Sequence, residues 1–544
     1  MFCYQCEQTA KSEACTVKGV CGKEDEVASL QDALIYSLKG LALVVEQADP
    51  QGLVEPDTYP FLAQALFVTL TNVNFDPDSI ASWTHEAVGR RDELKARLLE
   101  KSGFAAFSEP PASFEPAEDV HELADQGRQH GINAEAASDP DIRSLQHAVL
   151  YGLKGVAAYT EHASELGYHD AEVDAYLVEA LVGLARFDQG SLADWVAKAL
   201  RCGEMNYKTM ALLDRANSES FGTPVPTSVP LGVKAGKAVL VSGHDLADLK
   251  ALLEQTEGKD IYVYTHGEML PAHAYPKLKA HGHLYGNYGG AWYKQKTQFP
   301  DFPGPVLMTS NCIQIPSDSY ADRLYTRAVV SVPGAKHLED RDFSELVRSA
   351  LALPGFPDDA PAGEVTVGFM RSAVLAEAEK VVELVKAGKI RHIFLVGGCD
   401  GAKPGRDYYT RFVEQTPPDT LVLTLACGKY RFYDKDLGSI DGLPRLLDMG
   451  QCNDAYSAIQ VALALAEAFG VEVNELPLSL IVTWYEQKAV AVLLALLHLG
   501  IRNIRLGPTM PAFLTLGVRR RIFDTLDLKP VTTPEEDLAD ILGA

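Results

Sequence analysis

Beyond residue 236 the sequence alternates short apolar runs with helical patterns, and this alternation limits the fold more than any other feature. The first series contains KAVLVSG, DLADLKALLEQ, DIYVYTHG and VLMTSN, and a second starts with EVTVGFM and continues through HIFLVGG, TLVLTLA, SLIVTW and NIRLGP. Runs rich in β-branched residues that alternate with helices predict parallel sheets covered by helices. The proline-rich FPDDAPAGE near Phe356 indicates a boundary. We therefore expect two α/β domains, residues 223–358 and 359–544.

Residues 1–222 have a different texture and contain an internal repeat. SLQDALIYSLKGLALVVEQA, from Ser29, matches SLQHAVLYGLKGVAAYTEHA, from Ser144, at 11 of 20 positions. Apolar residues recur at steps of three and four, so both copies predict buried helices. Second helical patterns follow, FLAQALFVTLTNVNFD from Phe61 and YLVEALVGLARFD from Tyr176, and the prolines of SEPPASFEP separate the copies. Two duplicated helix bundles are therefore expected here.

Composition excludes several classes of function. Asp and Glu outnumber Lys and Arg by 74 to 49, and the resulting net charge of −25 repels a phosphate backbone, so we expect no nucleic-acid partner. The N-terminus lacks the basic start and apolar run of a signal peptide, and charged residues interrupt the most apolar stretch, 478–500. We expect a cytoplasmic protein without membrane spans. In a cytoplasmic protein, nine cysteines indicate metal binding or catalysis rather than disulfide bonds.

Side chains that can bind metal follow the predicted strands. Ligands of parallel sheets bind beyond the carboxyl ends of the strands. These positions hold His244, Glu268, Cys312, Cys399, Cys427, Glu486 and Lys488, and Cys452 precedes a helix. Thiolates suit iron and sulfide, whereas carboxylate and imidazole suit iron bridged by oxygen. Although one such cysteine alone is more often a buried hydrophobe, the whole set predicts a cluster of mixed sulfur and oxygen character.

A second group of cysteines lies at the N-terminus with the spacing C-x2-C-x8-C-x5-C. Its members are Cys3, Cys6, Cys15 and Cys21. Four thiols can bind either zinc or an iron–sulfur cluster, and the loose second pair favours iron–sulfur. Two disulfide bonds between these cysteines are the weaker alternative, because a cytoplasmic compartment keeps thiols reduced. A cluster without catalytic residues beside it would pass electrons.

Together these motifs resemble one known family. MFCYQCEQTA, SGHDL, THGEMLPAHAYP, SNCIQ, GGCDGA, ACGKYR, GQCND and WYEQKAVA occur in this order, and with them the whole chain is similar to the hybrid-cluster (prismane) proteins, which are hydroxylamine reductases. The resemblance implies a multidomain α and α/β fold. In it, an N-terminal iron–sulfur domain of duplicated helix bundles precedes two Rossmann-like parallel-sheet domains.

The resemblance also implies two cofactors. The four N-terminal cysteines would hold a [4Fe-4S] cluster, because their short spacing is similar to the branch of the family that carries this cluster. A hybrid iron–sulfur–oxygen cluster of the 4Fe-2O-2S type would bind His244, Glu268, Cys312, Cys399, Cys427, Cys452 and Glu486. The resemblance further implies that Cys399 is a persulfide and that Lys488 lies at the cluster.

The implied reaction is the reduction of hydroxylamine to ammonia and water. His244, Glu268 and Lys488 are the candidates for delivering protons or stabilising charge on the leaving oxygen. No strand runs into a G-x-G-x-x-G turn, so we expect an external electron-donor protein to supply the first cluster of a monomeric chain.

Three other readings stay open. The same site could reduce nitric oxide, or the chain could be a sensor of nitrosative stress that passes a nitrosyl group to other proteins. Carbon monoxide dehydrogenase has a similar architecture but uses nickel, so iron without nickel would exclude it.

Overall fold

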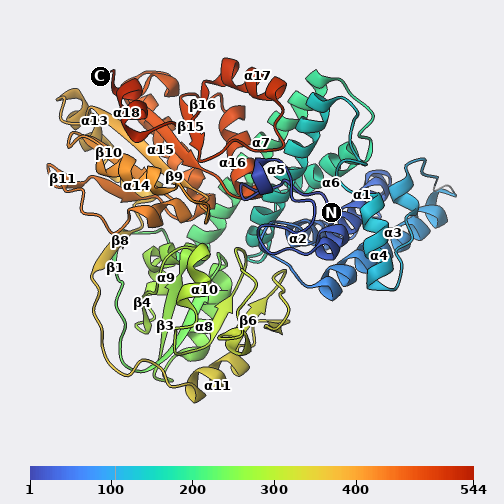
Figure 1. Cartoon of the computed structure of the whole chain (residues 1–544), viewed down its shortest axis with the longest axis horizontal. Coiled ribbons are helices and arrows are strands. Elements are labelled where there is room, and N and C mark those ends of the chain that lie inside the picture. The colour runs from blue at the N-terminus through green and yellow to red at the C-terminus, as the bar shows by residue number, and fades with distance from the viewer. Residues whose placement is uncertain (104–105, 544) are drawn as a thin grey trace.

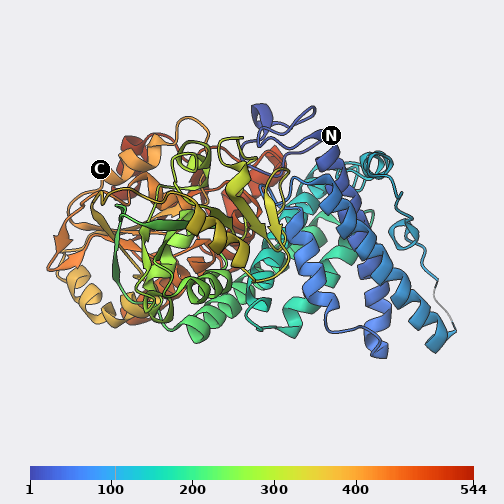
Figure 2. The same cartoon turned by 90° about the horizontal axis from the view of Figure 1, so that it is seen from below.

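The computed structural model describes residues 1–103 and 106–543, and it has a helical part followed by two α/β parts. Figures 1 and 2 show the helical part on one side of the molecule and the two α/β parts on the other. The helical part contains α1 (Asp25–Ala48), α2 (Thr58–Val68), α3 (Pro77–Ser102), α4 (Val120–Gln129), α5 (Pro140–Ser164), α6 (Ala171–Ala185) and α7 (Leu192–Phe221). This order of elements confirms the predicted fold class.

Helices α1 and α5 are the two copies of the sequence repeat, and both are core helices. The segment Asp25–Gln51 is long and apolar enough to cross a membrane, but 94% of its most apolar window is buried inside the protein. Helix α1 packs against α3, α4 and α6, whereas α5 packs against α7, α2 and α16 (Gln487–His498). The second copy therefore connects the helical part to the last α/β part.

The helix predicted from Phe61 is shorter than its sequence pattern. Helix α2 ends at Val68, and residues 69–76 form turns instead of further helix. Thr69 donates its hydroxyl to the Leu66 carbonyl, and Asn72 has a left-handed φ of 59°. Short polar side chains that bond the backbone locally compete with the helix, and this competition explains the early end.

Both α/β parts contain a six-stranded parallel sheet with the same connectivity. The first sheet has the order β4 (Leu284–Asn287), β3 (Ile261–His266), β2 (Lys237–Ser242), β5 (Val306–Met308), β6 (Leu324–Arg327), β7 (Lys336–Leu338). The second has the order β13 (Leu446–Asp448), β10 (Thr420–Thr424), β9 (His392–Gly398), β14 (Leu478–Thr483), β15 (Ile504–Gly507), β16 (Leu528–Pro530). Numbered within each part, both follow the Rossmann order 3-2-1-4-5-6. The strand order reverses between β2 and β5 and between β9 and β14, and such switch points are where ligands bind.

Helices cover these sheets. They include α8 (Leu246–Thr256), α11 (Ser344–Ala352), α12 (Arg371–Ala376), α13 (Ala378–Lys386), α14 (Asp407–Glu414), α15 (Ala455–Phe469), α16, α17 (Leu516–Leu526) and α18 (Pro534–Leu542). The helix predicted through AEAEKVVELVKAG is α13, and the short α12 precedes it, separated by Glu377, whose ψ of 7° departs from helical values.

The run EVTVGFM, predicted to start the second parallel sheet, lies outside it. It forms β8 (Glu364–Val367), which pairs antiparallel with β1 (Thr227–Pro230). Exposed and buried residues alternate along β8, as they do in a strand that has one solvent-exposed face. Central strands of a parallel sheet are instead apolar on both faces. The domain boundaries at residues 222 and 358 stay predictions.

Two glycines allow α16 to lie directly on the helical part. A Cβ atom on Gly155 of α5 would lie 2.7 Å from the Gln487 carbonyl oxygen, and one on Gly203 of α7 would lie 2.0 Å from the Leu494 carbonyl oxygen. Side chains larger than hydrogen do not fit at such distances. The contact therefore fixes the first turn of α16 against α5.

Replacing Gly155 with Ala is expected to lower the free energy of unfolding by about 1–3 kcal/mol, because the new methyl group overpacks the contact with α16. The matched control is Gly89→Ala in α3. Gly89 is exposed, and its Cβ would meet no atom of the described residues within 4 Å. That substitution should raise stability by about 0.5–1 kcal/mol. Denaturant unfolding measures both; equal effects of the two substitutions would contradict the close contact.

Candidate metal centre

The ends of six strands and one helix start carry the predicted metal-binding side chains. His244 follows β2, Glu268 β3, Cys312 β5, Cys399 β9, Cys427 β10 and Glu486 β14, while Cys452 begins the short turn before α15. All seven line one cavity with an empty volume of about 350 Å³. Each is at most 9% exposed. The structure therefore brings together every one of these seven residues, from both sheets.

The imidazole of His244 is oriented by its own surroundings. Its Nδ1 lies 2.9 Å from the Asn311 carbonyl oxygen and 3.1 Å from the Ser310 hydroxyl. A proton on Nδ1 satisfies the carbonyl, which leaves the lone pair of Nε2 toward Glu268, whose Oε2 is 3.8 Å away. Burial lowers the pKa of His244 well below its usual value, so the ring stays neutral. A neutral ring held by a backbone carbonyl is the usual form of a metal ligand.

Glu268 has one carboxylate oxygen bound and one unpaired. Its Oε2 accepts a hydrogen bond of 2.9 Å from the backbone N–H of Cys452, whereas its buried Oε1 meets no hydrogen-bond partner in the part of the chain that the structure describes. Ligand atoms of His244, Glu268 and Cys452 all lie within 4.8 Å of one another. A buried oxygen without a partner costs free energy unless a cation or donor satisfies it.

Glu486 and Lys488 occupy the start of α16. Glu486 caps the helix, since its Oε2 accepts the backbone N–H of Lys488 at 2.7 Å. The ammonium of Lys488 donates to Asn311 Oδ1 at 2.8 Å and lies 3.2 Å from His244 Nε2. Lys488 is therefore beside the cavity and touches one of its candidate ligands.

The charge balance of the cavity favours a bound cation. Burial, together with nearby carboxylates, raises the pKa of Cys312, Cys399 and Cys427 well above its usual value, and burial raises that of Cys452 to about 12. Burial also raises the pKa of both glutamates. Bound metal ions reverse this effect and deprotonate coordinating thiols. Four thiols, two carboxylates and one imidazole thus fit a cluster with both sulfur and oxygen ligands.

The four N-terminal cysteines, named here the N-terminal cage, also lie together. The backbones of Cys3 and Cys15 exchange hydrogen bonds of 3.0 and 2.8 Å. The pKa of Cys6 is raised well above its usual value, first by burial and then by Cys21, Cys3 and Cys15, so all four thiols are close enough to interact. Cys6 and Cys15 are buried, while Cys3 and Cys21 are partly exposed. Such a set fits a metal centre near the surface.

Several residues at the cavity were not predicted. Gln451 donates to the backbone carbonyls of His244 at 3.2 Å and Glu268 at 2.8 Å, and Trp292 lines the cavity wall. The hydroxyl of Tyr159 on α5 is near the Cys452 thiol and is unpaired with any described oxygen or nitrogen. A signal for Tyr159 existed, since the first repeat has Val44 at the equivalent position. A polar residue at a position that is apolar in the other copy of a buried repeat indicates that its side chain faces a polar group.

Comparisons with known proteins match the whole length of the chain or nearly so. The family described as Prismane/CO dehydrogenase family matches residues 1–539. A hydroxylamine reductase of Syntrophobacter fumaroxidans is 57% identical over 543 residues, and one of Methanocella arvoryzae is 55% identical over 544 residues, with 100% of each chain covered.

Solved structures show the same fold at low identity. Carbon monoxide dehydrogenase IV of Carboxydothermus hydrogenoformans is 16% identical with a TM-score of 0.56, and the alignment covers 99% of this chain and 92% of that chain. The enzyme of Thermococcus sp. AM4 is 17% identical with a TM-score of 0.55, and the coverage is 100% and 90%.

Replacing Cys427 with Ser should lower the metal content of the anaerobically purified protein, because an alcohol is a poor substitute for a thiolate ligand. The metal bound by the N-terminal cage should remain. Cys202→Ala is the control, since Cys202 is fully buried on α7 against Gly152 and is not among the residues that line the cavity. Metal analysis decides: if Cys427→Ser keeps the full metal content, Cys427 is not a ligand.

Proposed function

The chain belongs to the Prismane/CO dehydrogenase family, and from this premise we propose that it reduces hydroxylamine to ammonia and water at the strand-end cavity. The observation that carries the proposal is the convergence of seven ligand-type side chains on one cavity. Full-length relatives named hydroxylamine reductase, at 55–57% identity, support the same activity.

Proteins of this family carry a [4Fe-4S] cluster and a hybrid cluster. We propose that the N-terminal cage holds the first and that the seven cavity residues hold the second, with Cys399 as a persulfide. Both donor sets fit, since four thiols suit a cubane and the unpaired oxygen of Glu268 suits an oxygen-containing centre. When bound, the hybrid cluster would pass electrons to the substrate and act as a Lewis acid toward it.

The chain's own groups supply protons and positive charge. Breaking the N–O bond takes two electrons and two protons, so that NH2OH + 2 H⁺ + 2 e⁻ gives NH3 + H2O. The Lys488 ammonium is suited to donate a hydrogen bond to the leaving oxygen, because it already reaches His244 Nε2 and is 4.0 Å from Glu486 Oε1. Glu268, which lines the same cavity, is the second candidate for moving a proton.

Electrons come, in this proposal, from a separate donor protein that docks at the N-terminal cage. Cys3 and Cys21 are partly exposed, whereas the cavity residues are buried, so a protein donor reaches the cage first. We also propose that the protein is cytoplasmic, because none of its nine cysteines, all of which lie in the described residues, is paired in a disulfide, as a reducing compartment favours.

Replacing Lys488 with Met should reduce kcat for hydroxylamine about 100-fold, because the substitution removes the positive charge beside the reacting atoms. Iron content and the spectra of both centres should stay near wild type. Lys386→Met, on the exposed end of α13, is the control and should have no effect. Steady-state assays with a reduced donor measure both, and an unchanged kcat in Lys488→Met would remove Lys488 from the mechanism.

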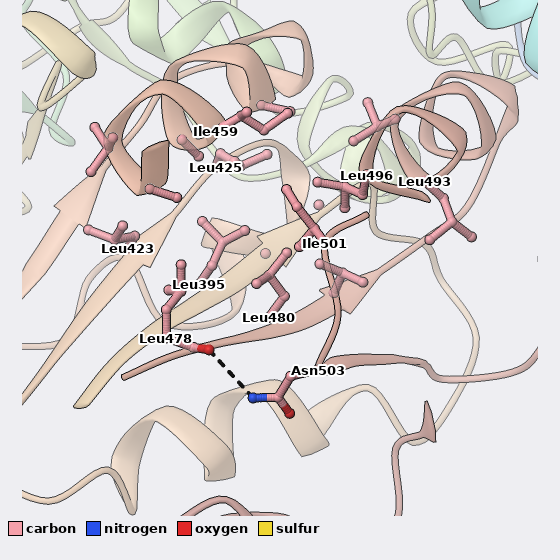
Figure 3. A pocket seen from close by; sticks show the side chains of 18 of the residues that line it. Leu395, Leu423, Leu425, Ile459, Leu478, Leu480, Leu493, Leu496, Ile501 and Asn503 are labelled. Carbon is pink, nitrogen blue, oxygen red and sulfur yellow. Dashed lines mark hydrogen bonds between the residues drawn. The ribbon is translucent and has the colours of Figure 1, made fainter. Parts of the chain in front are cut away.

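An apolar pocket supports nitric oxide as a second candidate substrate. Leu395 and Leu480 on strands and Ile459, Leu493 and Leu496 on α15 and α16 point into this space (Figure 3). Its empty volume is about 1350 Å³. One end is lined by the polar residues Asn474, Arg502 and Asn503, and the other reaches Cys399 and Cys452. An apolar passage favours a neutral diatomic molecule over hydroxylamine, which would have to leave its hydrogen bonds with water.

Narrowing this pocket should separate the two substrates. Ile459→Phe is expected to slow consumption of nitric oxide several-fold at limiting concentration while it leaves hydroxylamine turnover unchanged. Leu463→Phe is the matched control, because Leu463 is on the same helix but 39% exposed. If Ile459→Phe and Leu463→Phe consume nitric oxide equally fast, the pocket is not its route.

A further inference from the structure

A buried arginine joins the two loops that carry cysteines of different centres. Arg406, at the start of α14, has a side chain only 1% exposed. Its Nη2 donates to Glu7 Oε2 at 2.6 Å, and its Nη1 donates to the Asp400 carboxylate. Glu7 directly follows Cys6 of the N-terminal cage, and Asp400 directly follows Cys399 of the cavity. One guanidinium therefore holds both loops.

The same arginine reaches the strand that leads to Glu486. Nη1 of Arg406 also donates to Thr483 Oγ1, at 2.8 Å, at the end of β14. Next to it, the backbone N–H of Glu7 donates to the Tyr485 carbonyl oxygen at 2.9 Å. A backbone hydrogen bond thus joins the residue after Cys6 of the N-terminal cage to the residue before Glu486 of the cavity.

Further cations balance the two carboxylates. Arg431 Nε donates to Asp400 Oδ2 at 2.5 Å, and Lys403 Nζ lies 3.5 Å from Glu7 Oε1. The side chains of Glu7 and Asp400 are fully buried. Burying ion pairs brings little or no stability compared with apolar packing, whereas it can specify one geometry. A geometric role therefore accounts for this network better than a stabilising role.

We propose that Arg406 is a positioning residue that fixes the N-terminal cage and the strand-end cavity at the separation required for electron transfer between their centres. The inference rests on the proposed function and deepens it. Electrons from a reduced electron-transfer protein would reach the cavity by way of the cage, and Arg406 would keep the distance between the two fixed. Two such electrons, with two protons, convert each hydroxylamine to ammonia and water.

The test uses Arg406→Lys in the holoenzyme, because lysine keeps the charge but cannot donate to both carboxylates in one plane. Both centres should keep their iron content and EPR signals. After rapid mixing with dithionite, the cage centre should be reduced at the wild-type rate, and reduction of the cavity centre should be about 10- to 100-fold slower. Arg411→Lys is the control, since Arg411 lies on α14 and pairs with Glu535 at the surface.

Equal rates of cavity reduction in Arg406→Lys and wild type would overturn the proposal. If Arg406→Lys loses a metal centre, Glu7→Gln is measured instead, because glutamine keeps the shape of the side chain and removes its charge. Slower reduction of the cavity centre in Glu7→Gln supports the proposal, and a wild-type rate overturns it. A wild-type protein that passes electrons between the centres but does not reduce hydroxylamine would overturn the proposed function alone.

Discussion

The burial of four thiols, two carboxylates and one imidazole around one cavity is the constraint on which the rest of the structure depends. Thiolates and carboxylates repel one another and lose their hydration when buried, so without a metal centre the site favours protonated thiols and carboxyls even beside the Lys488 ammonium. The unpaired Oε1 of Glu268 is a local sign of this need. A cationic cluster held by these residues, as we propose, would satisfy all seven groups at once.

The architecture follows from bringing these groups together. Two sheets of the same strand order present their switch points to one cavity, so loops from both can contribute ligands. The helical part completes the arrangement, because Gly155 and Gly203 let α16 pack directly on α5 and α7. That contact sets the position of Glu486 and Lys488, which begin α16.

Much of this was predictable from the sequence because parallel strands align their carboxyl ends, so His244 and Cys399 share one kind of position. The exceptions have physical causes. β8 leaves the sheet because only one of its faces is apolar, and α2 stops at Val68 because the Thr69 hydroxyl bonds the Leu66 carbonyl and Asn72 adopts a left-handed φ. The repeat marks Tyr159 as a polar replacement but does not identify its neighbour Cys452, and the contact of Arg406 with Glu7 joins residues hundreds of positions apart in sequence.

The measurement that tests this account most directly is EPR spectroscopy of the anaerobically purified protein during stepwise reduction, combined with iron, sulfide and nickel analysis. The account predicts iron and sulfide in two spectroscopically distinct centres, one of them not a simple cubane, and no nickel. A single iron–sulfur signal that accounts for all bound iron, or stoichiometric nickel, would contradict it, because the cavity residues would then hold no hybrid cluster.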